Sequence, residues 1–329
     1  MDITVVSLNP SIDWQWSTPT FEYGGLNRAN SGKRYASGKG INVCAALKNL
    51  GLDPLCIGFN YRENEDFITH ALDEWGVGYD FVTVNGAVRV NIKLYDDATG
   101  EMTELNQPGA YVPAEDLHAL YEKFETVTGW YTAINDVNMR SRKKREPSSN
   151  NSESPLLILS GSMPAGVPVD TYARLCAAWP GRVILDADGK ALHNALTGKK
   201  PPFCIKPNLY ELRSSFGVKL PTRDEIAEFC QMLIRDYGVE MICVSMGAEG
   251  AMLVTVSDAY YVPAQKVEVR GVQGAGDAMV AGIAYGLAQG LPVPELLRTA
   301  IAAATATVIR DGTLMCTLAG FRKYLSIAN

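Results

Sequence analysis

The chain has 329 residues, of which 47% are hydrophobic and 20% are charged, and its formal net charge is −6. These values lie near the averages of globular proteins and exclude collagen-like, disordered and coiled-coil architectures. The acidic balance also argues against general attraction to nucleic acids or anionic lipids, so we expect neither nucleic acid nor membrane as a partner.

Two further features bear on the cellular compartment. Met1-Asp2-Ile3 leads directly into a strand-like segment, without the basic stretch and apolar run of a secretion signal. The seven cysteines are odd in number, scattered, and contain no CxxC pair. Such cysteines are typical of reduced core thiols, and we therefore expect a cytoplasmic protein.

Short β-branched runs alternate with helical runs along most of the chain. Residues 40–50 predict a helix that Gly51 ends, and residues 64–75 predict the next one. This alternation is typical of a parallel sheet covered by helices on both faces, so we expect an α/β fold with a mostly parallel central sheet. The predicted strands of this sheet are 3–8, 54–58, 79–84, 156–159, 182–185, 202–205 and 241–244.

Two segments interrupt this order. Residues of about 14–34 and 88–107 contain alternating positions without intervening helices, most clearly in Val90-Asn91-Ile92-Lys93-Leu94-Tyr95. They predict a small β-sheet inserted into the α/β core as a lid. One face of such a sheet must be covered, and either a partner subunit or a bound ligand would cover it.

Residues 136–155 differ from both kinds of segment. They contain a basic run from Arg140 to Arg145, followed by Pro147 and a serine- and asparagine-rich stretch without apolar residues to bury. We expect a flexible surface loop here. The alternative is a nucleic-acid or localisation patch, which the acidic total disfavours.

The strongest chemical signal is Gly274-Ala275-Gly276-Asp277, which opens a helical run. Small residues let the backbone turn tightly and present consecutive free N–H groups at a helix start, which makes an anion site. Asp277 then lies in the first helical turn. Taken alone, this residue is equally an ordinary acid that offsets the helix dipole.

Two other turns admit two interpretations each. Gly38-Lys39-Gly40 leads into a helix, where Lys39 is either a solvated lysine or a cation beside a phosphate or a sugar hydroxyl. Asn208 follows a buried strand, and Glu211 comes three residues later. This spacing is that of a capping box written with asparagine, and the same amide and carboxylate are suited to hold hydrated magnesium.

Other catalytic signatures are absent from the sequence. There is no G-x-x-x-x-G-K-[ST] of a P-loop and no complete G-x-G-x-x-G, which weakens the alternative of a nicotinamide oxidoreductase. There is also no G-x-S-x-G elbow and no H-E-x-x-H, and the three histidines are dispersed.

The turns described above belong to an ordered series of seven motifs that runs the length of the chain. The series is Asn9-Pro10-Ser11-Ile12-Asp13, Ser37-Gly38-Lys39-Gly40-Ile41-Asn42-Val43, Arg89-Val90-Asn91-Ile92-Lys93, Ser160-Gly161-Ser162-Met163-Pro164-Ala165-Gly166, Lys206-Pro207-Asn208 with Glu211, Ser245-Met246-Gly247-Ala248-Glu249-Gly250, and Gly274-Ala275-Gly276-Asp277. In this order the motifs resemble those of the ribokinase-like (PfkB) sugar kinases. The first two motifs are similar to the phosphosugar branch of that family, 1-phosphofructokinase and tagatose-6-phosphate kinase.

The resemblance implies a ribokinase-like three-layer α/β/α sandwich over residues 1–329, with the β lid, and a homodimer formed through that lid. It implies a phosphotransferase with an alcohol acceptor, which uses ATP and Mg²⁺ to phosphorylate a ketohexose phosphate. The expected reaction converts fructose 1-phosphate to fructose 1,6-bisphosphate. Asp277 would be the base, and the amides of Gly274, Ala275 and Gly276 would hold the charge that develops on the transferring group.

The resemblance also implies which residues bind each substrate. Lys39 and Arg89, and more weakly Arg28, would clamp the phosphate that the sugar already carries. Asn208 and Glu211 would hold magnesium through water. The remaining implied residues are Asp13, Gly38 and Asn42 for the sugar, and Lys206, Ser245, Gly247 and Gly250 for the nucleotide.

Tagatose-6-phosphate kinase and 6-phosphofructokinase of the same family stay open as alternatives. A catalytically silent sugar-phosphate sensor is the alternative from another class, and the intact Asp277 disfavours it. The chain departs from the family pattern at two places. Val272-Gln273 stands where Thr-Val is common, and Asp186-Ala187-Asp188 stands where Asp-Ser-Ser or Asp-Cys-Ser is common.

Overall fold

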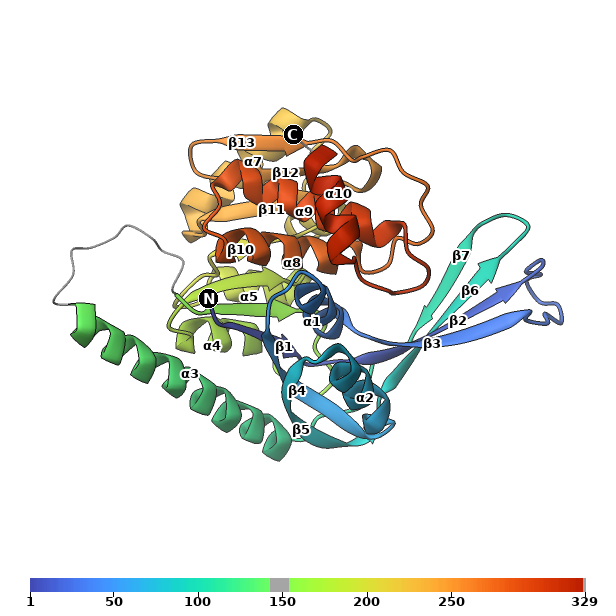
Figure 1. Cartoon of the computed structure of the whole chain (residues 1–329), viewed down its shortest axis with the longest axis horizontal. Helices are drawn as coiled ribbons and strands as arrows, with labels where there is room; N and C mark the ends of the chain where they lie inside the picture. Colours follow the sequence, from blue (N-terminus) through green and yellow to red (C-terminus); the bar gives the residue numbers. More distant parts are fainter. Residues whose placement is uncertain (143–153, 328–329) are drawn as a thin grey trace.

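The computed structural model describes residues 1–142 and 154–327, with side chains for all of these except 132–142. A nine-stranded sheet forms its centre (Figure 1). The strand order is β13-β12-β11-β10-β9-β8-β1-β4-β5, in which all neighbours from β11 to β5 are parallel and β12 and β13 are antiparallel. The strands are β1 (Ile3–Ser7), β4 (Pro54–Glu63), β5 (Gly78–Ala87), β8 (Leu156–Ser160), β9 (Arg182–Asp186), β10 (Cys204–Ile205), β11 (Met241–Ser245), β12 (Ala251–Val254) and β13 (Ala259–Val262).

All seven strands predicted for this sheet are confirmed, and the apolar runs that predicted them are buried in the structure. The five residues of β8, for example, are completely buried apart from traces at Ser160, as expected for a parallel strand with helices on both faces. β10 is shorter than predicted because Pro201 and Pro202 have no N–H to give to a neighbouring strand. The hairpin of β12 and β13 was not predicted.

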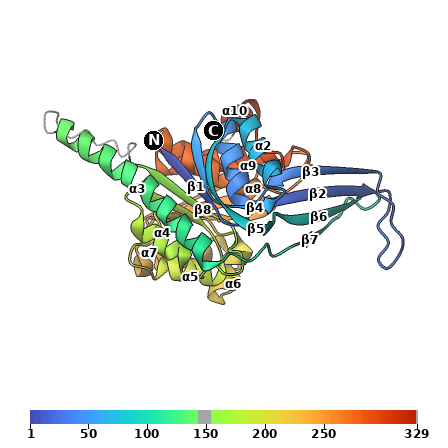
Figure 2. The same ribbon diagram turned by 90° about the horizontal axis from the view of Figure 1, so that it is seen from below.

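Helices cover both faces of the sheet, which confirms a three-layer α/β/α sandwich (Figure 2). Helices α1, α2, α8, α9 and α10 form one layer, and α3 to α7 form the other. No helix among the described residues is long and apolar enough to cross a bilayer. The helices are α1 (Lys39–Asn49), α2 (Glu65–Trp75), α3 (Ala114–Arg142), α4 (Thr171–Ala178), α5 (Gly189–Leu196), α6 (Leu209–Phe216), α7 (Arg223–Tyr237), α8 (Ala275–Ala288), α9 (Val293–Val308) and α10 (Leu318–Ile327).

Helix α3 differs from the expected surface loop at 136–155. Its first turns are anchored by the buried side chains of Leu120, Phe124 and Val127, and the helix then continues through Arg142. Each residue added to an existing helix gains a hydrogen bond without a new nucleation cost, so polar residues extend it. Residues 136–142 are therefore helical, and the part of the predicted loop at 143–153 lies outside the described residues.

A second, four-stranded sheet projects from the sandwich (Figure 1). Its order is β3-β2-β6-β7, where β2 (Ser11–Thr18) pairs with β3 (Ser31–Ser37) in antiparallel and with β6 (Arg89–Asp96) in parallel orientation, and β7 (Met102–Asn106) closes the edge. We call it the lid sheet. It lies on the segments of about 14–34 and 88–107 in which the alternating pattern occurs.

The carboxyl ends of the parallel strands meet at one edge of the central sheet, where ligands bind in open α/β folds. Helix α1 starts at this edge and packs closely against β1. A Cβ atom at Gly40 would lie 2.9 Å from Ser7 Cα, so only glycine lets the helix approach so near. This contact places Lys39 and Asn42 over the edge.

Candidate active site

Two adjoining cavities occupy this edge of the central sheet, and the lid sheet lines part of both. The larger measures about 560 Å³ and is lined from β2, β6 and β7 on one side and from α8 on the other. The smaller measures about 220 Å³ and lies beneath Lys39. Of the predicted site residues, the larger cavity collects Asp13, Gly38, Lys39, Asn42, Arg89, Lys206, Asn208, Glu211, Ser245, Gly274, Gly276 and Asp277.

Asp277 lies in the first turn of α8, whose N-cap is Gly274 with a left-handed φ of 73°. Its side chain is 5% exposed, and its Oδ2 accepts a hydrogen bond from Asn42 Nδ2 at 2.8 Å. Burial raises the pKa of Asp277 to about 6, against the opposing positive charge of Lys39. A carboxylate with this pKa is ionised at neutral pH and is a stronger base than an ordinary aspartate.

A buried carboxylate at the end of β9 organises the cations around Asp277. Asp186 is 1% exposed, and its two oxygens lie 3.2 Å from Lys206 Nζ and 3.3 Å from Lys39 Nζ. Burial acts to raise the pKa of Asp186, but the two lysines hold it below its usual value. Asp186 in turn raises the pKa of Lys39 and keeps it charged. Sequence analysis gave Asp186 no role, because its burial and its two partners are not visible in the sequence.

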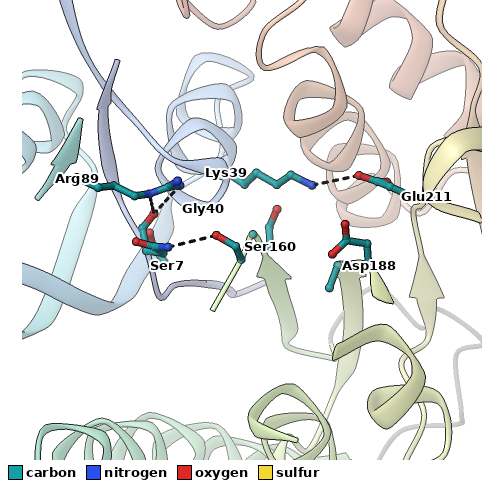
Figure 3. A pocket seen from close by; sticks show the side chains of 11 residues that line it. Ser7, Lys39, Gly40, Arg89, Ser160, Asp188 and Glu211 are labelled. Atoms are coloured by element: carbon teal, nitrogen blue, oxygen red, sulfur yellow. Dashed lines mark hydrogen bonds and ion pairs between the residues drawn. The ribbon is translucent and has the colours of Figure 1, made fainter. Parts of the chain in front are cut away.

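Lys39 and Arg89, the predicted phosphate clamp, both line the smaller cavity (Figure 3). Lys39 extends toward Glu211, with Nζ at 3.9 Å from Oε1. Arg89 donates hydrogen bonds to the carbonyl oxygens of Asn9 and Gln107 at 3.1 to 3.2 Å. Each of the two cations therefore already has oxygen partners of its own in this structure.

Hydroxyl groups complete the smaller cavity. Ser160, the last residue of β8, and Ser162 just after it line the cavity together with Asn9, whose Nδ2 donates to Ser162 Oγ at 3.2 Å. The serine motif carries no assigned role in the sequence, because serines after a strand are common in any loop. Asp188, one of the departures from the family pattern, also lines the cavity and is exposed. Arg28, by contrast, lies exposed in the connection between β2 and β3 and lines neither cavity.

Asp13 is held by a buried network on the lid sheet. Its carboxylate is 2% exposed and accepts hydrogen bonds from Ser37 Oγ at 2.9 Å and Asn91 Nδ2 at 3.0 Å. Lys93 Nζ, on a side chain that is 6% exposed, forms an ion pair with it at 2.6 Å. Arg89, Asn91 and Lys93 are two residues apart on β6 and therefore share one face. That period was available in the sequence, where only Arg89 was assigned.

Asn208 and Glu211 form the capping box that their spacing predicts. Asn208 Oδ1 accepts from the Glu211 amide at 2.7 Å, and Glu211 Oε2 accepts from the Asn208 amide at 2.8 Å. Both residues still line the larger cavity. The described residues contain no group of three or more His, Cys, Asp or Glu side chains that could hold a metal ion by themselves. This donor set fits an ion that keeps most of its waters, as Mg²⁺ does.

A third cavity of about 510 Å³ adjoins the start of α8 and is mainly apolar. Ser245, Gly247 and Gly250, predicted at the nucleotide, line it, as does Ala275. Gly250 has a φ of 106°, and a Cβ atom there would lie 2.7 Å from Pro263 Cα. Lys206 lies instead in the larger cavity, held by Asp186. The other main lining residues are Ala264, Lys266, Val267, Val269, Met279, Ile301, Ala304 and Val308.

Replacing Lys93 by methionine leaves Asp13 buried without its cation. Because three neutral donors, Ser11 Oγ, Ser37 Oγ and Asn91 Nδ2, still reach that carboxylate, we expect the free energy of unfolding to fall by about 3 kcal/mol, the lower end for a broken buried pair. In the double variant Asp13→Asn/Lys93→Met most of this loss should be recovered. Urea denaturation measures both, and equal losses in the single and double variants would contradict the assignment.

Comparison with known proteins places this geometry among carbohydrate kinases. The family model of pfkB family carbohydrate kinases matches residues 122–318. A protein of Bacillus subtilis named 1-phosphofructokinase is 32% identical over 94% of this chain and 93% of its own length. An Escherichia coli protein of the same name is 32% identical over 93% of this chain and 90% of its own. The crystal structure of phosphofructokinase-2 from Escherichia coli with substrates and products superimposes with a TM-score of 0.86, at 25% identity, over 100% of this chain and 99% of that one.

Proposed function

The chain belongs to the pfkB family of carbohydrate kinases and has its ribokinase-like fold, and we propose that it transfers the terminal phosphoryl group of ATP to fructose 1-phosphate. The product is fructose 1,6-bisphosphate. The single observation that carries the proposal is the position of Asp277, a buried carboxylate on the wall of a cavity that Lys39, Arg89 and Lys206 also line. The name shared by the relatives supports the choice of sugar phosphate.

The sugar phosphate is assigned to the two cavities at the edge of the central sheet. Its phosphate lies in the smaller cavity, which Arg89 and Lys39 line and where Ser162 adds a hydroxyl donor. The Ser160 hydroxyl donates instead to Asp186 Oδ2 at 3.2 Å. Two cations that line one cavity suit a dianion, because each can supply a charge-assisted hydrogen bond to a phosphate oxygen. Its hydroxyls meet Asp13, whose carboxylate is fixed in orientation by Ser37 and Asn91.

The chemical step then runs at the start of α8. Asp277 accepts the proton of the acceptor hydroxyl while that oxygen bonds to the terminal phosphorus and the bond to the departing ADP oxygen breaks. The free amides of Gly274, Ala275 and Gly276 stabilise the charge on the transferring group. The adenosine end of ATP occupies the apolar cavity beside Ala275 and Gly250. Mg²⁺, held through water by Asn208 and Glu211, would neutralise phosphate charge when bound.

A homodimer that forms through the lid sheet, and a cytoplasmic location, belong to the same proposal. The connection between β2 and β3 of the lid sheet exposes two large apolar side chains, Tyr23 at 97% and Leu26 at 78%. On β7 of the same sheet, Leu105 is 68% exposed. Exposed apolar surface of this kind is typical of an interaction site. Arg28 lies in that connection and would face the partner. Sedimentation velocity tests the association.

The substrate assignment predicts a rank order of acceptors. We expect kcat/KM for fructose 1-phosphate to exceed those for fructose 6-phosphate, tagatose 6-phosphate and unphosphorylated fructose by at least about tenfold, the effect of one charge-assisted contact. Arg89→Ala should lower the value for fructose 1-phosphate and leave that for fructose unchanged. A coupled assay for ADP release measures both. Tight binding of every sugar phosphate without turnover would instead identify a sensor.

Asp277→Asn tests the base. An asparagine oxygen still accepts from Asn42, so folding and substrate binding should be retained, while turnover falls by roughly 10²–10⁴. Calorimetric titration with fructose 1-phosphate and with ATP gives the binding, and ADP release gives the rate. Activity within about threefold of the parent would remove Asp277 from this role.

The pH profile gives an independent test of the same carboxylate. Asp277 must lose its proton to act, so kcat/KM should fall as the pH drops through about 6. Lys39 opposes the rise in the pKa of Asp277, and Lys39→Met should therefore move this acidic limb to higher pH. Lys190→Met, at an exposed lysine of α5 outside the cavities, is the matched control and should leave the limb in place. A limb that stays or moves down in Lys39→Met would contradict the assignment.

A further inference from the structure

A side-chain bridge joins the lid sheet to the loop that precedes α8. Gln273 Nε2 donates to Glu104 Oε1 of β7 at 3.0 Å and lies 3.0 Å from Met102 Sδ of the same strand. Through this side-chain contact β7 is tied to the C-terminal half of the chain. The bridge therefore connects β7 of the lid sheet to the segment that directly precedes the N-cap of α8.

The charge on Glu104 fixes which way the Gln273 amide points. Gln273 Oε1 is buried without a partner, while Nε2 faces the carboxylate. Turning the amide over would place its oxygen against a negative charge, so only the observed orientation gives a hydrogen bond. A bond from an amide to a carboxylate is also stronger than one between neutral groups.

Both residues of the bridge line the larger cavity, and each is a neighbour in the backbone of one part of the proposed site. Glu104 lies directly opposite Lys93 in the pairing of β7 with β6, and Lys93 holds Asp13. Gln273 immediately precedes Gly274, the N-cap of α8. The path Asp13, Lys93, Glu104, Gln273 therefore runs from the sugar side to the anion-binding loop.

We propose that Gln273 is a positioning residue, which acts through Glu104 to set the spacing between the sugar held by Asp13 and the loop that receives the transferring phosphoryl group. This proposal rests on the proposed function. Chains with the more common Thr-Val at 272–273 have a valine in place of Gln273, and valine has no donor to offer Glu104. The bridge thus belongs to this chain's own sequence.

A double-mutant cycle tests the bridge. Gln273→Leu and Glu104→Ala should each lower kcat/KM for fructose 1-phosphate by about fivefold, which is the effect of one such hydrogen bond. The double variant Gln273→Leu/Glu104→Ala should lose about fivefold as well, because both changes remove the same contact. Glu104→Gln keeps an acceptor and should lie between Glu104→Ala and the parent. Thr103→Ala, the exposed neighbour on β7, is the control and should match the parent, and the Kd of ATP without sugar should be unchanged throughout.

The proposal would be overturned if the losses in kcat/KM multiplied in the double variant. It would also be overturned if the Kd of ATP rose by the same factor as kcat/KM falls. Hydrogen exchange of the β7 amides supplies a readout that needs no turnover. Exchange should become faster in Gln273→Leu and Glu104→Ala alike, and remain at the parent rate in Thr103→Ala. If the parent phosphorylates no sugar phosphate, the proposed function fails while this coupled exchange still supports the bridge; unchanged exchange in both variants would overturn it.

Discussion

The candidate site depends on one buried charge, the carboxylate of Asp186. An unpaired carboxylate with 1% exposure would be costly, and two lysines from different parts of the chain, Lys39 of α1 and Lys206 after β10, offset that cost. Asp186 in turn positions the two lysines, because the ion pairs fix both ammonium groups at the edge of the sheet. Asp277 is ionised in a buried position beside them. Removing Asp186 would leave Lys206 without its ion pair and Lys39 with the more distant Glu211 at 3.9 Å.

The two sheets contribute different residues to this site. The central sheet supplies fixed points at the ends of its parallel strands, where Ser160, Asp186 and Asn208 lie. The lid sheet supplies Asp13 and its supporting residues from strands that project away from the sandwich (Figure 1). A site built from a rigid sheet and a projecting one changes its dimensions when the two move relative to each other. Contacts between the two sheets therefore determine the dimensions of the site.

Much of the fold and of the site was accessible from the sequence, for physical reasons. Buried parallel strands leave continuous apolar runs, and glycine turns at helix starts leave Gly38 and Gly274. The features that could not be predicted from the sequence are those that depend on burial and on contacts between residues distant in the chain. Asp186 reads as any acid after a strand, and the partner of Lys93 is distant in sequence. The polar end of α3 carries no apolar stripe, and nothing local distinguishes its continuation as a helix from a loop.

The capping box at the start of α6 has a consequence for anyone who studies metal dependence here. Glu211 fastens the first turn of that helix with the oxygen next to the one offered to the cavity. A variant at this position would fray the helix and lose a water-binding group at the same time. Titrations of such a variant with magnesium would mix local unfolding with ion affinity, and a circular dichroism trace recorded alongside would be needed to separate the two.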